Sequence, residues 1–203
     1  MATLTMKVSR ADLDAVRALL DGLRTDGGIK AHVLAVNKTL TGVRTDATDE
    51  VYQRLNLTKT RIRRDMTVSR ATYANPAGRL VARGKPVGLI SFSGTRQIKK
   101  GVSVLVRRGG KRTVLKHAFI ATAKNAKNVF WREWTGPRQP VRPTFRYARL
   151  PKIYRHPIHR LTGPRIEDIL ADLEVLGNVQ EKGWARYRKN IDYEVQRVLD
   201  RYR

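Results

Sequence analysis

Apolar residues recur every three or four positions between residues 29 and 55, and this is the clearest pattern in the chain. The stripe consists of Ile29, Val33, Val36, Leu40, Val43, Ala47, Val51 and Leu55. Such spacing places these side chains on one face of an α-helix. We therefore predict a long amphipathic helix over residues 28–55. Because the stripe is rich in Val and Ala and lacks flanking charge pairs, it favours packing on a sheet over a coiled coil.

Two shorter elements are predicted before this helix. Leu4, Met6 and Val8 alternate with polar residues, as in a half-buried strand. Leucines at helical spacing then predict an amphipathic helix over residues 10–24. The sequence Asp26-Gly27-Gly28 is expected to break this helix before the long one begins.

After the long helix the pattern changes to that of strands and turns. Asn56 is expected to end the helix and to cap a short helical turn from Thr58 to Asp65. Beyond it, runs rich in β-branched residues predict strands at 66–73, 79–83, 87–92, 102–106, 113–116 (with a possible continuation through 119–121) and 129–132. The strongest hairpin joins 102–106 to 113–116, where Gly109-Gly110 supplies positive φ angles for the turn. We expect one antiparallel sheet over residues 66–134.

The C-terminal third divides into a proline-rich segment and a helical one. Residues 135–160 hold five of the eight prolines together with many arginines, which predicts an extended arm. Pro164 is expected to open a helix whose apolar face is Ile166, Ile169, Leu170, Leu173 and Leu176. Gly177 and Gly183 are expected to kink it, and a last helix carries Trp184, Tyr187, Ile191, Val195, Val198 and Tyr202.

These elements predict an α+β fold, in which an antiparallel β-sheet is packed against a long N-terminal amphipathic helix and C-terminal helices, with a Pro/Arg-rich extended arm. The predicted organisation is a core over residues 1–134, the arm over 135–160 and a helical segment over 161–203 that packs on the core. A chain of 203 residues is long enough to bury such a core.

Charge changes this picture, because it is concentrated in the predicted sheet and arm. The chain has 42 Lys plus Arg against 17 Asp plus Glu, a formal charge of +25 at pH 7. Residues 66–166 contain 23 of the basic side chains and a single acid, Glu133. A segment of this kind repels itself unless it meets counterions, a polyanion or an acidic protein face. A solvated basic surface without a specific partner is the simpler alternative. We favour a surface that faces a polyanion.

Several function classes find no support in the residues. No run of 18 apolar residues is present and the first ten residues lack the apolar region of a signal peptide, so neither a membrane span nor secretion is expected. The absence of cysteine removes thiolate metal sites and cysteine nucleophiles. His156 and His159 are three residues apart, but two histidines in a basic arm do not make a metal site. The acids lie on the outer faces of the predicted amphipathic helices, where we expect them to be solvated. No nucleophile and base can be assembled, so we expect no enzyme and no cofactor.

The residues do offer basic side chains interleaved with aromatic ones. The side chains expected to face DNA or an acidic partner are Lys99, Lys100, Arg107, Arg108, Lys111 and Arg112. Trp131, Trp134 and the aromatics of the arm lie among further arginines, as in single-stranded nucleic-acid sites. Arginine and aromatic residues are also enriched in protein–protein interfaces. Composition therefore leaves both a nucleic-acid site and a protein interface open.

A series of short segments, taken in order, resembles the minor tail protein Z family of tailed bacteriophages and prophages, also called tail completion proteins. The segments are Ala35-Val36-Asn37-Lys38-Thr39, Leu55-Asn56-Leu57, Arg61-Ile62-Arg63-Arg64, Leu89-Ile90-Ser91-Phe92, Arg96-Gln97, Lys100-Gly101-Val102-Ser103-Val104, Ala118-Phe119-Ile120-Ala121 and Leu161-Thr162-Gly163-Pro164-Arg165-Ile166. The resemblance covers about residues 28–175. The family usually reaches its Leu-x-Gly-Pro segment through a short linker, so the role of the arm is not inherited.

The resemblance implies a structural virion protein at the head-proximal end of the tail, assembled in the host bacterial cytoplasm. Such a subunit would form a ring, with a hexamer favoured, that joins tail to head and surrounds the DNA path. Expected partners are further copies of the chain, the tail terminator, tail tube and head-completion proteins, and genomic DNA contacted without sequence specificity. Subunit contacts are expected at Arg138, Arg142, Phe145, Tyr147, Arg149, Tyr154, Leu161, Gly163, Pro164 and Ile166. The alternative is a free nucleic-acid-binding protein of the ribosome or nucleoid.

Overall fold

The structure is a computed structural model that describes residues 2–4, 25–123, 125–133 and 157–200. The chain forms two units. Unit 1 comprises Met1–Lys85 and Pro164–Arg203, and unit 2 comprises Pro86–Gly163. Both units contain antiparallel sheets, and unit 1 also contains two long helices. The α+β class predicted from the sequence is therefore confirmed.

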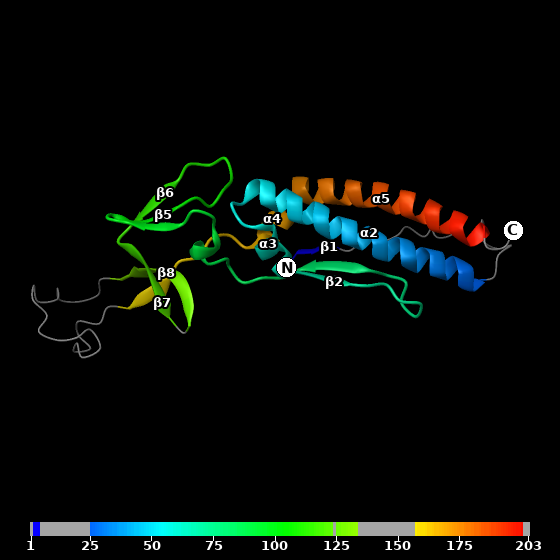
Figure 1. Ribbon diagram of the computed structural model, residues 1–203, viewed down its shortest axis with the longest axis horizontal. Coiled ribbons are helices and arrows are strands. Elements are labelled where there is room, and N and C mark those ends of the chain that lie inside the picture. Colours follow the sequence, from blue (N-terminus) through cyan, green and yellow to red (C-terminus); the bar gives the residue numbers. More distant parts are fainter. Residues whose placement is uncertain (1, 5–24, 124, 134–156, 201–203) are drawn as a thin grey trace, which may run out of the picture. The chain divides into compact units, whose positions relative to one another are not determined.

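Two long helices form one side of unit 1. Helix α2 spans Thr25–Arg54 and α5 spans Leu173–Leu199, and they lie side by side in antiparallel orientation (Figure 1). The predicted stripe is buried from Val33 to Leu55, which confirms the long helix, whereas Ile29 is exposed. Helix α2 packs on α5 as well as on strands of unit 1. The expectation of packing on a sheet was therefore incomplete.

Helix α2 begins before the two glycines that were expected to lie outside it. Gly27 and Gly28 are part of the helix. A Cβ atom at Gly27 would lie 3.2 Å from the Val198 Cγ1 atom of α5. The glycine thus permits close approach of the two helices, a benefit that offsets its low helix propensity.

The contact between α2 and α5 carries a ladder of polar pairs. Arg186 donates two hydrogen bonds of 2.8 Å to Asp46, and Lys182 donates one of 2.7 Å to Glu50. At the end of α2, Arg54 contacts Asp172 at 3.2 Å and Glu174 at 2.9 Å. The sequence analysis placed the helix acids on solvated outer faces. That was wrong for Asp46 and Glu50, because their partners lie more than 100 residues away along the chain.

His32 is buried in unit 1 and bridges two distant segments. Its Nε2 atom lies 3.2 Å from the Pro76 carbonyl oxygen, which can only accept, so Nε2 carries the proton. Its Nδ1 atom lies 3.0 Å from the Tyr187 hydroxyl, which therefore donates. Burial lowers the pKa of His32 below its ordinary value, although the Pro76 carbonyl partly opposes this shift. The neutral ring fits both hydrogen bonds.

We expect His32 to make unit 1 less stable in mild acid. The unfolded chain binds a proton at this histidine near pH 6.5, and the folded chain binds it only at lower pH. Stability is therefore full above about pH 6.5 and falls as the pH drops toward the lowered pKa of the folded state. Urea unfolding of the wild type and of His32→Gln at pH 7.5 and 5.5 measures this. Glutamine keeps a donor and an acceptor but does not titrate, so equal losses in both proteins would contradict the prediction.

The other elements of unit 1 are short. Helix α3 spans Lys59–Arg64 and is capped by Thr58, whose Oγ1 accepts from the Arg61 backbone N–H at 3.3 Å; Asn56 is not the cap. Strands β1 (Ala2–Leu4), β2 (Met66–Ser69) and β3 (Arg79–Ala82) form an antiparallel sheet in the order β1-β3-β2. Strand β2 is shorter than the predicted 66–73. The helix expected over 10–24 lies outside the described residues.

The C-terminal helices differ from the prediction in where they divide. Helix α4 spans Ile166–Leu170 and follows Pro164 by two residues. Helix α5 then begins at Leu173, because the Asp172 carboxylate accepts from the Glu174 backbone N–H at 3.1 Å and caps it. Leu173 is consequently exposed, whereas Val175 and Val179 are buried. Gly177 and Gly183 lie within α5, so the two helices expected there are one.

Unit 2 contains two three-stranded antiparallel sheets. The first has the order β4-β5-β6, with β4 at Arg96–Ile98, β5 at Gly101–Val104 and β6 at Thr113–Lys116. The second has the order β7-β8-β9, with β7 at Ala118–Ala123, β8 at Ala126–Arg132 and β9 at Ile158–Arg160. With the sheet of unit 1, the strands of the described residues form three sheets, whereas one sheet was expected from the sequence.

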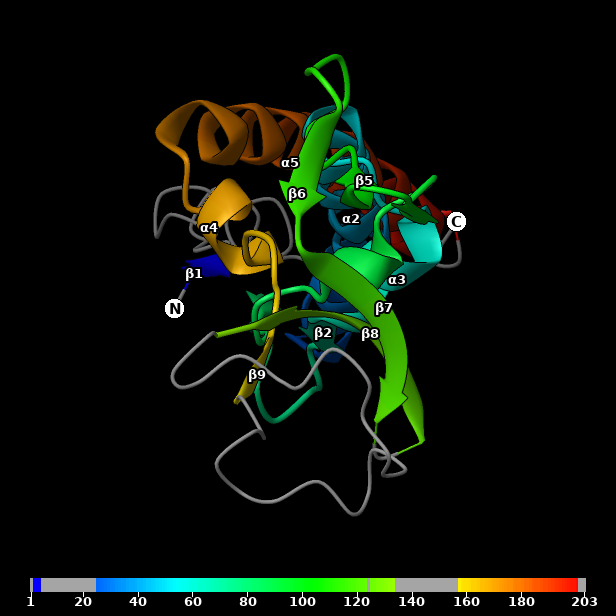
Figure 2. The ribbon, with the colours of Figure 1, turned by 90° about the vertical axis from the view of Figure 1, so that its left-hand side faces the viewer.

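A left-handed residue separates the two sheets of unit 2. His117 has φ 62°, and the chain changes direction there between β6 and β7 (Figure 2). Gln97 links the sheets, because its Oε1 accepts from the Ile120 backbone N–H at 2.8 Å and its Nε2 donates to the Gly101 carbonyl at 3.0 Å. The predicted hairpin of β5 and β6 is confirmed, with Val102 opposite Leu115.

The strand predicted over 87–92 is replaced by a 3₁₀ turn at Leu89–Ser91, labelled η1. Val87, Leu89 and Phe92 are buried. The Thr95 hydroxyl donates to the Leu89 and Phe92 carbonyls at 2.9 and 2.8 Å and so satisfies the end of the turn. Apolar residues at these spacings suit a turn as well as a strand, and periodicity alone does not separate the two.

Candidate nucleic-acid interface

Positive charge is concentrated in unit 2. Its 78 residues contain 18 Lys plus Arg and one acid, whereas unit 1 contains 24 and 16. That one acid, Glu133, lies 2.9 Å from the Nε2 atom of His159 on β9. Opposite charge for the lysines and arginines must therefore come from outside unit 2.

The connection between β5 and β6 presents four of the predicted basic residues. Arg107, Arg108, Lys111 and Arg112 are all exposed around Gly109. The positive φ predicted for the turn is confirmed at Gly109, at 80°, but not at Gly110. Within the described part of the chain, Arg107 and Lys111 have no partner for their charged groups. We call residues 107–112 the hairpin tip. Its charges suit contact with phosphates, which are bound without reading base edges.

Arg112 serves the fold of unit 2. Its Nη1 atom donates to the Gly94 carbonyl oxygen at 2.7 Å and lies 3.5 Å from the Ser103 hydroxyl. These contacts tie the hairpin tip to the turn that precedes β4. Gly94 has φ 72°, a conformation that glycine adopts without strain. Arg112 thus positions the tip while it keeps its own positive charge.

The two remaining predicted residues are not part of the hairpin tip. Lys99 and Lys100 form the turn between β4 and β5, at the opposite end of β5 from the tip. A four-residue strand spans roughly 13 Å, so the six residues form two separate clusters. The register places Lys116 opposite Gly101, next to the Lys99-Lys100 turn, and Arg96 opposite Ser103, toward the tip. The sequence analysis missed Lys116 and Arg96, since only strand pairing brings them to these clusters.

The second sheet of unit 2 adds aromatic side chains. Trp131 is exposed on β8, opposite His159 of β9. On the other face of the sheet, the Arg132 guanidinium lies 5.6 Å from the centre of the Phe119 ring, and Phe119 packs against Phe130. Of the aromatics singled out from sequence, Trp131 is therefore available for stacking. Trp134 and the aromatics of the arm lie outside the described residues.

The residues predicted to form subunit contacts fall into two groups. Arg138, Arg142, Phe145, Tyr147, Arg149 and Tyr154 lie outside the described residues. Leu161, Gly163, Pro164 and Ile166 are described, and Ile166 is fully buried in unit 1. Gly163 donates to the Val87 carbonyl at 2.7 Å, and a Cβ atom there would lie 2.8 Å from the Phe92 ring. These contacts serve the fold of the chain, and a role between subunits stays a prediction.

In the described ranges, no group of three or more His, Asp or Glu side chains is arranged to hold a metal ion. His159 contacts Glu133, and His156 lies outside these ranges. No described helix combines the length and apolar character needed to cross a bilayer.

Comparisons with known proteins give one match. The model of a family described as prophage minor tail protein Z (GPZ) matches residues 13–203 of the chain. No curated protein and no solved structure matches. The match extends the resemblance seen in residues 28–175 toward both ends of the chain.

Proposed function

From the premise that the chain belongs to the prophage minor tail protein Z family, and so is a structural protein of a phage tail, we propose that it is a neck or tail-completion subunit. In this proposal, copies of the chain form a ring at the head-proximal end of the tail, with a hexamer favoured. The ring joins the tail to the head and surrounds the path of the DNA. Its neighbours are the tail terminator, tail tube and head-completion proteins.

The observation that supports this proposal most directly is the charge of unit 2. Eighteen basic side chains accompany one acid, which already contacts a histidine. In a ring, such a surface lies against DNA phosphates or against acidic neighbours, either of which offsets the repulsion. Contacts to phosphates hold DNA without sequence preference, as a channel for a whole genome requires.

The hairpin tip is proposed to contact DNA, and the charges of Arg107 and Lys111 can be removed without affecting a described contact. We expect Arg107→Gln/Lys111→Gln to reduce the slope of log binding constant against log salt concentration by about 1.8, since each phosphate contact contributes about 0.9. Fluorescence anisotropy with a short DNA duplex measures this. The matched control is Arg70→Gln/Arg79→Gln, which removes the same charge from exposed positions of unit 1. An equal change in both variants would contradict a specific role for the tip.

Quantitative mass spectrometry of density-purified, nuclease-treated particles from the source strain tests the function itself. Finding roughly six or twelve copies per particle would support a ring with closed cyclic symmetry. Absence from particles, together with abundance in ribosomal or nucleoid fractions, would overturn the proposal and favour a free nucleic-acid-binding protein. The alternative rests on the same charge and on exposed Trp131, a ring on which bases can stack.

A further inference from the structure

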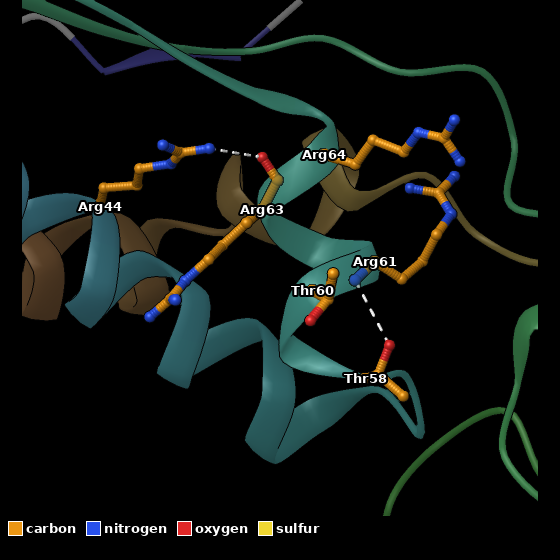
Figure 3. A pocket seen from close by; sticks show the side chains of 6 residues that line it. All are labelled: Arg44, Thr58, Thr60, Arg61, Arg63 and Arg64. Atoms are coloured by element: carbon orange, nitrogen blue, oxygen red, sulfur yellow. Dashed lines mark hydrogen bonds between the residues drawn. The ribbon is translucent and has the colours of Figure 1, made fainter.

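A pocket of about 550 Å³ lies beside the short helix α3 in unit 1 (Figure 3). Its walls are formed by α3, by the residue that caps it and by one side chain of α2. The lining residues are Arg44, Thr58, Thr60, Arg61, Arg63 and Arg64. Four cationic side chains thus line one pocket, and no described carboxylate or aromatic ring lines it with them.

Three of these four charges are not neutralised within the described part of the chain. Arg61 forms an ion pair with Asp65 at 2.9 Å. Arg44 donates through Nη2 to the Arg63 backbone carbonyl at 2.9 Å, which is a neutral acceptor, and the Arg63 and Arg64 side chains are exposed without an acidic partner. Elsewhere in unit 1, Arg54, Lys182 and Arg186 each contact a carboxylate. Like charges held close together repel, so an anion in the pocket would be stabilised.

The pocket also offers hydrogen-bond donors suited to a phosphate group. The hydrogen bond to the Arg63 carbonyl holds Arg44 across the space between α2 and α3 (Figure 3). The Arg44 Nε atom is buried and has no hydrogen-bond partner among the described residues. The exposed Thr60 hydroxyl adds a donor, and the guanidinium groups of Arg63 and Arg64 extend to opposite sides of α3 (Figure 3). Guanidinium groups bind phosphate oxygens through paired hydrogen bonds.

We propose that this pocket binds a phosphate group of the DNA backbone. The lining consists of arginine and threonine, which suits the phosphodiester and, among the described residues, includes no aromatic ring on which a base could stack. The choice of DNA over an acidic peptide rests on the proposed function, in which the chain lies beside DNA. This is a second DNA contact of the chain, on unit 1, and it does not require the ring proposed above.

Binding of the full-length chain to a 20-base-pair duplex, measured by fluorescence anisotropy over a range of salt concentrations, tests this inference. We expect Arg63→Gln/Arg64→Gln to weaken binding at low salt by roughly tenfold or more, since hydrogen bonds to a charged group are the strong ones. The slope against log salt should fall by about 0.9, because one phosphate contact is lost. The matched control is Arg188→Gln/Lys189→Gln, which removes an adjacent exposed basic pair from α5 of the same unit. Thermal unfolding establishes that both variants are folded.

Comparison of the two variants, and of DNA with other anions, decides whether the pocket binds a DNA phosphate. Duplex DNA bound less well by the pocket variant than by the control variant supports the proposal. Equal binding by both variants would overturn it. The NMR signals of the Arg63 and Arg64 Nε–H groups show which anion is bound. If inorganic phosphate or polyglutamate protected these groups from exchange with water and DNA did not, the pocket would hold a free anion or an acidic partner, and the proposal would be overturned. Each result is independent of whether the chain is found in particles.

Discussion

Gly101→Ala is expected to unfold the β5–β6 hairpin. Gly101 has φ 143°, and an alanine Cβ there would lie 2.0 Å from the Leu115 carbonyl oxygen. That oxygen belongs to the backbone of β6, where Lys116 pairs with Gly101, so the overlap is relieved only if the strands separate. We expect a loss of about 3 kcal/mol or more, at the severe end for a single substitution.

Hydrogen exchange measures this loss in the two units separately. Amides of β5 and β6 should lose their protection in the variant, while amides of α5 keep theirs. Gly109→Ala is the matched control, because it also places alanine at a positive φ, 80°, but its Cβ would meet nothing within 4 Å. It should cost only about 1 kcal/mol of backbone strain. Full protection of β5 in Gly101→Ala would show that the strands tolerate the side chain.

Lys38→Ala is expected to destabilise unit 1 by about 2 kcal/mol, because it removes a partner from a buried carboxylate. Glu194 on α5 has a side chain only 1% exposed, and it forms an ion pair with Lys38 of α2. Without Lys38, its described charged partner is Arg197, at 3.3 Å on the same helix. The expected loss of unfolding free energy is smaller than for a fully buried ion pair, because the Lys38 side chain itself is 48% exposed.

A lysine of α3 provides a close control. Lys59 is 47% exposed, pairs with Asp49 at 2.6 Å and lies over the Tyr52 ring, much as Lys38 lies over Tyr193. The difference is that Asp49 is 41% exposed. Lys59→Ala should therefore cost less than about 1 kcal/mol. Urea unfolding followed by helical circular dichroism compares the two, and equal losses would mean that burial of Glu194 does not govern the effect.

Local patterns in the sequence determined much of this fold. The apolar stripe predicted α2 because a helix must bury one face, and the alternating residues around Gly109-Gly110 predicted β5, β6 and the turn between them. The order of short segments indicated the family that the comparison then matched. The charge of residues 66–166 was likewise plain from the sequence, and most of it belongs to unit 2.

Only the tertiary structure decided which charges act together. Lys99 and Lys100 are close to the hairpin tip in sequence, but β5 places them at its opposite end, while β6 returns Lys116 to their side. Asp46 and Glu50 look like solvated helix acids until α5 supplies Arg186 and Lys182. Arg44 reaches α3 only because α2 packs beside it. Periodicity fixes which face of an element is apolar, whereas the partners of its polar side chains depend on packing between segments far apart in the chain.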